Sequence, residues 1–166
     1  MFHSIDLHHW TPEIFSLLPE RTPLLTAGTP ERCNTMTIGW AGLGTLWGKP
    51  VCTVYVRPQR YTRAFLDSSA YFSVAILPES QKEALHYCGT KSGRDGDKFS
   101  ACGLSPAYTE QGVPYPAQAE KVLICRKLYC QPMQPECFCE EELEKFYPGK
   151  DYHLQYIGEV VEVLSK

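Results

Sequence analysis

Six short segments of the chain carry strand-like patterns, joined by short helices or by hairpin-scale connections. These segments are residues 23–28, 35–40, 51–56, 71–77, 120–130 and 152–164. In the second of them, Met36, Ile38 and Trp40 alternate with glycine or threonine, the period-two pattern of a half-buried strand. Strands and helices do not alternate as a doubly wound parallel sheet would require. The chain is therefore predicted to be mainly β, an antiparallel barrel of six or slightly more strands with a few short helices.

Helical patterns are short and lie between the strand segments. The predicted helices are residues 11–19, 60–66 and 79–87. The first begins with the hydroxyl of Thr11 as its cap and with proline at the first helical position. The glycine-punctuated, charged stretch 89–99 is predicted to be a loop. Gly158 interrupts the last strand, which indicates a bulge or a close approach of another part of the backbone.

Composition limits the class of protein. With 166 residues, of which 43% are hydrophobic and 21% charged, the chain is predicted to be one globular domain over residues 1–166. A formal charge of −3 gives no basic excess for binding nucleic acid. No apolar run approaches the ~18–20 residues that span a bilayer, and the first residues lack the pattern of a signal peptide. No membrane segment is expected, and the expected location is the cytoplasm.

Eight cysteines raise the questions of disulfides and of metal binding. Cys52 and Cys125 lie inside apolar strand patterns, where a free thiol behaves as a small hydrophobic side chain. A chain of this size does not need disulfides to fold, so reduced thiols are expected. Cys125, Cys130, Cys137 and Cys139 are four candidate thiolates, but zinc knuckles lie on turns, whereas Cys125 lies within a strand pattern and could face away from Cys130. No metal is therefore predicted. The sequence leaves the role of these four cysteines open.

Two glycine-rich stretches resemble nucleotide-binding loops only in part. Residues 39–44 lack the third glycine of a dinucleotide fingerprint and do not open a helix. Residues 44–50 resemble a phosphate-binding loop, but Pro50 stands where the magnesium-binding hydroxyl would be. The glycines of both stretches are therefore expected in turns.

The segment between residues 34 and 62 concentrates groups that suit a phosphate. Arg57 and Arg60 offer the planar guanidinium that binds phosphate through two charge-assisted hydrogen bonds. Thr62 would cap the helix that follows, and a helix N-terminus itself attracts anions. The alternative is that both arginines are solvated surface charges, and the residue types alone do not decide between the two.

The same segment offers groups for a flat aromatic ring such as a flavin. The amide of Asn34 and the hydroxyls of Thr35 and Thr37 could meet the polar edge of the ring. Trp40 and Trp47 could supply apolar surface. In the alternative reading, the asparagine and the threonines only favour a turn and a strand.

Six short motifs stand in order along the chain: NTMTIGW at 34–40, WGKP at 47–50, VRPQRYT at 56–62, FSV at 72–74, SGRDGDKF at 92–99 and HLQYIGEV at 153–160. Together they resemble the flavin reductase-like family, in particular its flavoredoxin branch. The resemblance covers nearly the whole chain and implies a split β-barrel that binds FMN non-covalently and forms a homodimer. Residues 130–147, with an acidic run at 140–142, have no counterpart in it.

The resemblance also implies which residues hold the flavin. The part that contacts the isoalloxazine ring matches Asn34, Thr35, Met36 and Thr37. The phosphate and ribityl side matches Arg57, Arg60, Tyr61 and Thr62. A loop that closes over the flavin matches Ser92 to Lys98, with Lys98 as a direct contact. His153 matches a histidine near the ring, where the electron donor approaches, and is the catalytic residue that the resemblance implies.

The implied activity is that of an NAD(P)H-dependent flavin reductase, which passes electrons through FMN to a flavin or a redox-protein acceptor. His153 would position the donor or balance charge, a role suited to a side chain that titrates near neutrality. The first alternative is a non-enzymatic FMN-containing electron-transfer protein of the flavoredoxin type. A pyridoxamine phosphate oxidase would need further basic residues, and a purely structural protein would bind no flavin. The acceptor, the choice between NADH and NADPH, and whether FMN is fixed or exchanges are not predicted.

The aromatic content supports the implied dimer. Ten tyrosines and three tryptophans exceed what one small core normally hides. A symmetric dimer would bury the excess and would add a wall beside a flavin on the barrel rim.

Overall fold

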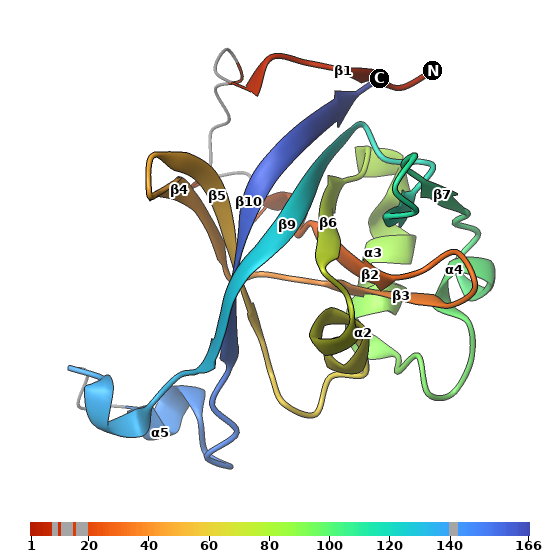
Figure 1. The fold of residues 1–166 in the computed structure, drawn as a ribbon. Helices are drawn as coiled ribbons and strands as arrows, with labels where there is room; N and C mark the ends of the chain where they lie inside the picture. Colours follow the sequence, from red (N-terminus) through yellow and green to blue (C-terminus); the bar gives the residue numbers. More distant parts are fainter. Residues whose placement is uncertain (8–9, 11–14, 16–19, 140–142) are drawn as a thin grey trace.

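The computed structural model describes residues 1–7, 10, 15, 20–139 and 143–166 (Figure 1). The helix predicted over residues 11–19 and the acidic run at 140–142 fall outside the described residues, apart from Phe15. Within the described part of the chain, no helix combines the length and the apolar character needed to cross a membrane.

Eight of the strands in the described residues form one antiparallel sheet. They are β1 (His3–Ser4), β2 (Leu24–Gly28), β3 (Cys33–Thr37), β4 (Ala41–Leu46), β5 (Lys49–Val56), β6 (Tyr71–Ile76), β9 (Lys121–Pro132) and β10 (Leu154–Ser165). Their order is β3-β2-β6-β9-β10-β5-β4, and β1 pairs with the C-terminal end of β10. In Figure 1, β9 and β10 run as long neighbouring strands between β6 and the β4–β5 hairpin. The predicted mainly β, antiparallel architecture is confirmed.

The helices are short. They are α2 (Thr62–Ser68), α3 (Lys82–Thr90), α4 (Lys98–Ala101) and α5 (Leu143–Phe146), with 3-10 turns η2 (Glu79–Gln81) and η3 (Pro135–Cys137). Helices α2, α3 and α4 lie against β2 or β3, whereas α5 does not. Figure 1 shows α3 and α4 beside β2 and β3, α2 near the lower end of β6, and α5 far from both. The helices predicted over 60–66 and 79–87 are present but begin two to three residues later, because turn residues precede each of them.

Four strands were not predicted, namely β1, β4 and the separate hairpin of β7 (Pro106–Tyr108) and β8 (Pro114–Pro116). Gly42 and Gly44, expected in turns, lie within β4, where glycine weakens the strand pattern. Only Gly48 lies in a turn: Trp47 and Gly48, with φ of 54° and 70°, form the two-residue connection to β5. The prolines of β7 and β8 likewise argue against strands in a sequence pattern, so this hairpin was not predicted.

The boundaries of β3 also differ from the prediction. The strand ends at Thr37 rather than at residue 40, because the chain bends at Gly39. Trp40 therefore lies outside the strand and is 42% exposed.

The sheet buries residues on both faces, because side chains along β9 alternate between two apolar cores. Leu123 and Cys125 pack into the core enclosed by β3, β5, β10 and α2. Val122 and Ile124 point the other way and pack into the core beneath α3 and α4, which also contains Phe99. Each of these β9 side chains is at most 2% exposed. This double burial explains why β9 has a near-continuous apolar sequence.

Gly158 lies where β10 shifts its register against β9, between Ile157 and Gly158. A Cβ at this position would lie 2.7 Å from the buried ring of Phe72 and 2.8 Å from the Cβ of Cys125. The bulge suggested by the sequence is confirmed, whereas the close approach is by side chains and not by another part of the backbone.

We expect Gly158→Ala to lower the free energy of unfolding by about 1–3 kcal/mol, because the added methyl group must displace Phe72 within a packed core. Urea denaturation followed by circular dichroism measures this change. Gly44→Ala on β4 is the matched control, since nothing lies within 4 Å of a Cβ there. Equal losses of stability in the two variants would contradict the packing argument.

Candidate functional site

Two adjoining hollows lie between β3, the β5–α2 connection and the loop of residues 91–97. The first, of about 280 Å³, is lined by Met36, Arg57, Gln59, Arg60, Tyr61, Thr62, Thr90, Lys91, Ser92, Gly93, Arg94 and Lys98. The second, of about 250 Å³, is lined by Met36, Thr37, Ile38, Gly39, Trp40, Tyr55, Arg57, Arg60 and His153. We call them the cationic hollow and the aromatic hollow. Met36, Arg57 and Arg60 border both, so the two hollows form one continuous recess.

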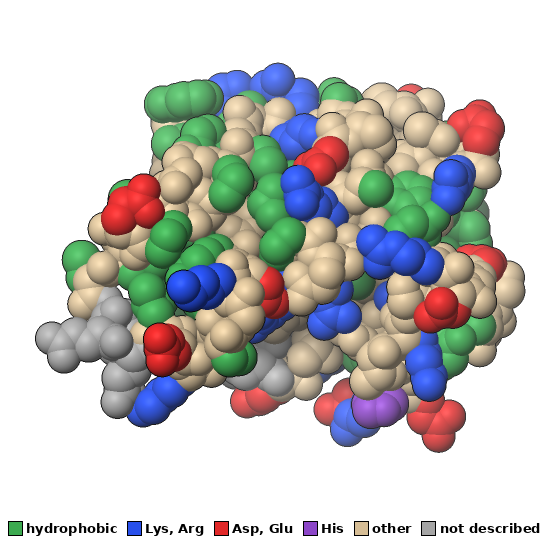
Figure 2. Space-filling view, turned by 90° about the horizontal axis from the view of Figure 1, so that it is seen from below, with side chains coloured by type: hydrophobic (Ala, Val, Ile, Leu, Met, Phe, Trp, Pro, Cys, Tyr) green, Lys and Arg blue, Asp and Glu red, His purple; other side chains and the backbone are tan. Residues whose placement is uncertain are grey.

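The lining of the cationic hollow carries five positive side chains and no carboxylate among the described residues. Arg60 Nη1 donates to the carbonyl of Gly89 at 3.2 Å, and Arg94 Nη1 donates to the carbonyl of Gln59 at 3.1 Å. A guanidinium has five N–H donors, so one such bond leaves several for a ligand. In Figure 2, Lys and Arg side chains are scattered across the face shown with acidic ones among them. The face shown in Figure 2 is therefore of mixed charge, whereas the lining of the cationic hollow is not.

Lys98 is the most buried of these cations, at 4% exposed. Its Nζ donates to the carbonyl of Cys88 at 2.7 Å. Burial lowers the pKa of Lys98, and the positive charge of Arg60 acts in the same direction. An anion in the hollow would oppose both effects.

Arg57 differs from the other cations because a carboxylate already pairs with it. Its Nη1 lies 2.5 Å from Oδ2 of Asp151, and its Nη2 donates to the carbonyl of Phe146 at 2.9 Å. Gln59 donates to the same Asp151 oxygen at 2.8 Å. The hydrogen bond from Arg57 lowers the pKa of Asp151. Arg57 therefore joins the end of β5 to the segment before β10, and it has less capacity for a phosphate than Arg60.

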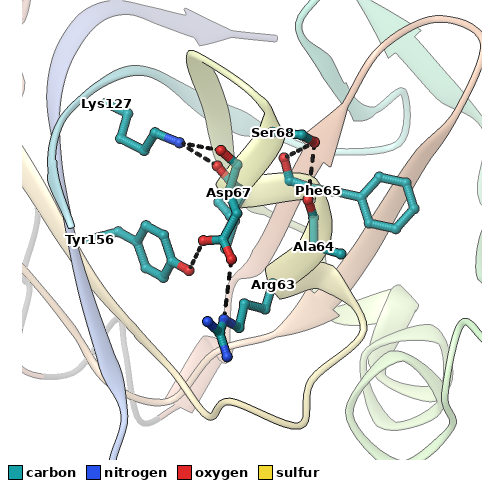
Figure 3. A network of polar contacts seen from close by, with 8 residues as sticks. Arg63, Ala64, Phe65, Asp67, Ser68, Lys127 and Tyr156 are labelled. Carbon is teal, nitrogen blue, oxygen red and sulfur yellow. Dashed lines mark hydrogen bonds and ion pairs between the residues drawn. The ribbon is translucent and has the colours of Figure 1, made fainter. Parts of the chain in front are cut away.

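The helix α2, which follows the β5 connection, is fixed to the sheet by the network in Figure 3. Oη of Tyr156 donates to Asp67 at 2.6 Å, and Arg63 forms an ion pair with the same carboxylate at 3.2 Å. Lys127 Nζ donates to the carbonyls of Leu66 and Asp67 at 2.6 and 3.1 Å. Burial, together with the bond to Asp67, raises the pKa of Tyr156, so the phenol keeps its proton. Strands β9 and β10 thereby hold α2 and the chain that precedes it.

Three polar residues predicted to meet the flavin are committed to bonds within the protein. Thr62 is the first residue of α2 and not its cap; its hydroxyl accepts from Asn34 Nδ2 at 2.8 Å. The predicted capping role of Thr62 is therefore wrong. The Thr35 hydroxyl is fully buried and accepts from the Thr26 hydroxyl at 2.9 Å. Asn34 and Thr35 do not line the recess, whereas Thr62 does.

Two glycines allow the loop and α3 to pack directly on β3. A Cβ at Gly93 would lie 2.1 Å from Oδ1 of Asn34, and one at Gly89 would lie 2.4 Å from Oγ1 of Thr37. Any larger residue would push the loop of residues 91–97 away from the strand. From the sequence these two glycines only indicate a loop, and their packing against β3 could not be predicted.

His153 closes the aromatic hollow. Its ring stacks on Trp40 with a centroid distance of 4.4 Å and a tilt of 32°. Its Nδ1 lies 3.0 Å from Oη of Tyr147, which is 4% exposed. Burial raises the pKa of Tyr147, so its phenol is protonated. When the phenol donates to Nδ1, the neutral imidazole carries its hydrogen on Nε2.

Burial lowers the pKa of His153 to about 4, and the charges of Arg57 and Arg60 act in the same direction. The imidazole is therefore neutral at physiological pH. The expectation that His153 titrates near neutrality and balances charge is wrong for this environment. A positioning role for His153 stays a prediction.

Nine of the residues predicted to form the site line the recess. They are Met36, Thr37, Arg57, Arg60, Tyr61, Thr62, Ser92, Lys98 and His153. Trp47, which was considered for apolar surface beside the ring, does not line the recess and is 74% exposed in the β4–β5 turn. The sequence analysis missed Arg94 and Tyr147. Arg94 could have been found from the sequence, because it is a basic residue inside the SGRDGDKF motif. No sequence pattern indicated that Tyr147 lies at the site.

A larger hollow lies elsewhere, on the other side of Tyr61. It has about 710 Å³ and is bordered by α2, the β2–β3 turn and residues 111–113. Arg32 is the one cation in its lining among the described residues. Volume alone would place a ligand there, but charge favours the smaller recess, which offers five cations to an anionic group.

The cysteine pairs considered for a metal do not come together. Cys125 is buried in the sheet, whereas Cys130, Cys137 and Cys139 are exposed. Among the described residues, no group of three or more His, Cys, Asp or Glu side chains is arranged to hold a metal ion.

The lowered pKa of His153 gives a prediction for stability. An unfolded histidine titrates near 6.5, so the unfolded chain takes up a proton before the folded one, and acid destabilises the fold. This loss begins as the pH falls below about 6.5 and is complete near pH 4. We expect the free energy of unfolding of the wild type to fall by about 2–3 kcal/mol more than that of His153→Gln over this range. Urea denaturation at each pH measures the difference, and parallel pH profiles would contradict the burial argument.

Comparisons with known proteins were made for the sequence and for the fold. The family model of the flavin reductase like domain matches residues 15–165. The structure of an FMN-binding protein from Thermus thermophilus superposes with a TM-score of 0.71 at 23% identity, covering 99% of this chain and 82% of that chain. Flavoredoxin from Methanosarcina acetivorans gives 0.71 at 21% identity, covering 99% and 76%. An NADH:FAD oxidoreductase from Streptomyces globisporus C-1027 gives 0.66 at 18% identity, covering 88% and 76%. Comparison with curated proteins finds no match.

These identities show a shared fold. The end strands β3 and β4 do not pair with each other in the described residues, so the sheet is open as in a split barrel. The predicted split β-barrel is thereby confirmed. Because the family model spans nearly the whole length, the chain belongs to the flavin reductase-like domain family, as its six motifs indicate.

Proposed function

We propose that the chain binds FMN non-covalently, with the phosphate in the cationic hollow and the isoalloxazine ring in the aromatic hollow. The observation that carries this proposal is the convergence of five cations on a lining without a carboxylate in the described residues. Like charges at this range repel, so a phosphate dianion would stabilise the arrangement. FMN is also the ligand that the name of the Thermus thermophilus neighbour gives for that protein.

The residues of the recess suit the two ends of FMN. Arg60, Arg94 and Lys98 provide the charge-assisted donors that a phosphate requires. Met36 and Trp40 provide the apolar surface against which a flat ring can lie. Because β3 is an end strand, one row of its peptide groups has no ladder partner among the described strands. These peptide groups, and not the side chains of residues 34 and 35, would meet the polar edge of the ring.

FMN supplies the redox chemistry when bound, and the chain supplies binding and orientation. Arg60 and Lys98 hold the phosphate and so fix the ring relative to β3. Tyr147 holds the ring of His153 through Nδ1, which directs the remaining N–H, on Nε2, as a donor. Neutral His153, stacked on Trp40, then positions the electron donor through this hydrogen bond without adding charge.

We propose that the chain, with FMN bound, is an NAD(P)H-dependent reductase that passes electrons to a flavin or a redox protein. Trp40, 42% exposed and next to His153, offers a surface on which a nicotinamide could stack. The neighbour from Streptomyces globisporus is named an NADH:FAD oxidoreductase in complex with NAD and FAD fragments, which supports this assignment.

The second candidate is an electron-transfer protein that accepts electrons from a protein partner. The observation that favours it is an aromatic cluster beside the aromatic hollow, in which Tyr147 lies 4.9 Å from Tyr152 and 6.0 Å from Phe138 between ring centroids. Such a cluster suits a protein–protein contact next to a flavin. A flavoredoxin is among the structural neighbours.

We further propose that residues 1–166 act as a single domain that forms a homodimer. Trp47, Phe146 and Val161 are each between 47% and 74% exposed and would gain from burial at an interface. A single monomeric species in sedimentation velocity at micromolar concentration would contradict the dimer. The eight free thiols support the cytoplasm as its location.

Arg60→Ala tests the proposed phosphate site. We expect it to weaken FMN binding by roughly 10- to 100-fold, the loss of a charge-assisted hydrogen bond worth about 1.5–3 kcal/mol, while riboflavin binding changes little. Quenching of flavin fluorescence on binding measures both affinities.

Arg63→Ala is the matched control, since Arg63 lies three residues on, outside the lining of both hollows, and pairs with Asp67. Equal losses for FMN and riboflavin in Arg60→Ala would contradict the phosphate assignment. So would an equal effect of the two arginine substitutions.

Anaerobic stopped-flow mixing of the FMN-loaded protein with NADH and with NADPH tests the reductase. We expect at least one of the two donors to bleach the flavin absorption band. No reduction by either at about 1 mM, the upper end of common KM values, would overturn the reductase in favour of the electron-transfer protein.

A further inference from the structure

Two cysteines face each other at the base of the loop that walls the cationic hollow. Cys88 lies in the last turn of α3 and is fully buried, whereas Cys102 follows α4 directly and is partly exposed. Their Sγ atoms are 3.8 Å apart. A disulfide has an S–S length of about 2.05 Å, so the two sulfurs need to approach by roughly 1.8 Å.

The surroundings of the pair connect it to the recess. Cys102 Sγ donates to the carbonyl of Lys98 at 2.8 Å, and Lys98 Nζ donates to the carbonyl of Cys88 at 2.7 Å. Lys98 therefore lies between the two thiols and the cationic hollow. The loop of residues 91–97 runs from α3, which contains Cys88, to α4, which Cys102 follows. Four of the residues that line the cationic hollow belong to this loop.

The backbone near Cys102 can accommodate this approach. The helix α4 has only four residues, and Gly103, with φ of 71°, follows Cys102 directly. A glycine after a single helical turn leaves the end of the helix adaptable. By contrast, the neighbouring thiols of Cys52 and Cys125 both lie within paired strands of the sheet and are at most 2% exposed.

We propose that Cys88 and Cys102 form a reversible disulfide that ties α3 to α4 and fixes the loop of residues 91–97 over the cationic hollow. Hydrogen peroxide is the oxidant. The exposed sulfur of Cys102 attacks one peroxide oxygen, which gives a sulfenic acid and releases water. The sulfur of Cys88 then forms the S–S bond and displaces a second water. Two thiols and one peroxide thus become one disulfide and two waters.

The division of roles follows from burial. Burial and the neighbouring thiol raise the pKa of Cys88 to about 12, so Cys88 is protonated and is not the first site of attack. Cys102, which reaches solvent, is oxidised first, and Cys88 resolves the sulfenic acid before it is oxidised further.

The effect on the flavin rests on the proposed function. The disulfide would close a ring between residues 14 apart in sequence, which contains the whole loop of residues 91–97. Because residues 91–94 form one wall of the cationic hollow, a cross-link that holds the loop in place should slow the release of FMN. Reduction by a thiol would restore the faster release.

Peptide mapping of the full chain tests the disulfide itself. After treatment with peroxide, blocking of free thiols and digestion with trypsin, we expect one cross-linked product that joins residues 83–91 to residues 99–121. It should be absent from Cys102→Ser and from protein treated with a thiol reductant. Cys137→Ser, which removes an exposed thiol outside the pair, is the matched control and should keep the cross-link. Sulfinic acid at Cys102 without a cross-link, or a disulfide between other cysteines only, would overturn the proposed disulfide between Cys88 and Cys102.

The rate of FMN release, followed by the recovery of flavin fluorescence on dilution, tests the effect on the loop. We expect release from oxidised wild type to be slower by roughly threefold or more than from the reduced protein, with no such change in Cys102→Ser. Unchanged release from cross-linked protein would overturn control of the flavin by the loop. A protein that binds no FMN would contradict the proposed function, and the peptide map would still decide the fate of the thiol pair.

Discussion

Repulsion among five positive side chains is the constraint on which the recess depends. The carbonyls of Cys88, Gly89 and Gln59 each accept from one of these cations, and Arg57 has a carboxylate partner. Carbonyl dipoles offset the repulsion only in part, because they carry no net charge. A bound anion would offset this repulsion further, which is why we propose the recess as the phosphate site.

The rigid parts of the fold lie where they oppose this repulsion. Helix α2 is held by Lys127 on β9 and by Tyr156 on β10, which fixes the chain that carries Arg60. The glycines at 89 and 93 let α3 and the loop rest on β3 without intervening side chains. The loop of residues 91–97 forms one wall of the cationic hollow, and the facing thiols of Cys88 and Cys102 lie close to its two ends. A covalent link between them would act on this wall of the recess.

How well the sequence predicted each element depended on local composition. Strand β9 was predictable because its apolar residues face two cores, and the register shift at Gly158 follows from the glycine itself. Strand β4 was not, because its two glycines and partial exposure leave no alternating pattern. The hairpin of β7 and β8 was not predicted because of its prolines; its two strands form a sheet of their own, separate from the main sheet.

The sequence indicated the positive side chains of the candidate site, but not the residues with which the site residues form hydrogen bonds and ion pairs. Arg57 and Arg60 were singled out by residue type and by the family resemblance, yet the partner of Arg57 is Asp151, 94 residues away, which no local pattern indicates. Asn34 and Thr62 likewise bond to each other across 28 residues, a pairing that the local sequence does not indicate. The pKa of His153 is set by burial beneath Trp40 and beside Tyr147, which only the folded chain brings together.

A crystal structure of the protein with FMN tests the central claim most directly. The account predicts that the phosphate lies in the cationic hollow, with its oxygens about 2.7–2.9 Å from donor nitrogens of Arg60 and Lys98. The ring should lie between Met36 and His153 along the free edge of β3. A phosphate bound instead in the larger hollow beside Arg32, with the cationic hollow filled by solvent, would contradict it.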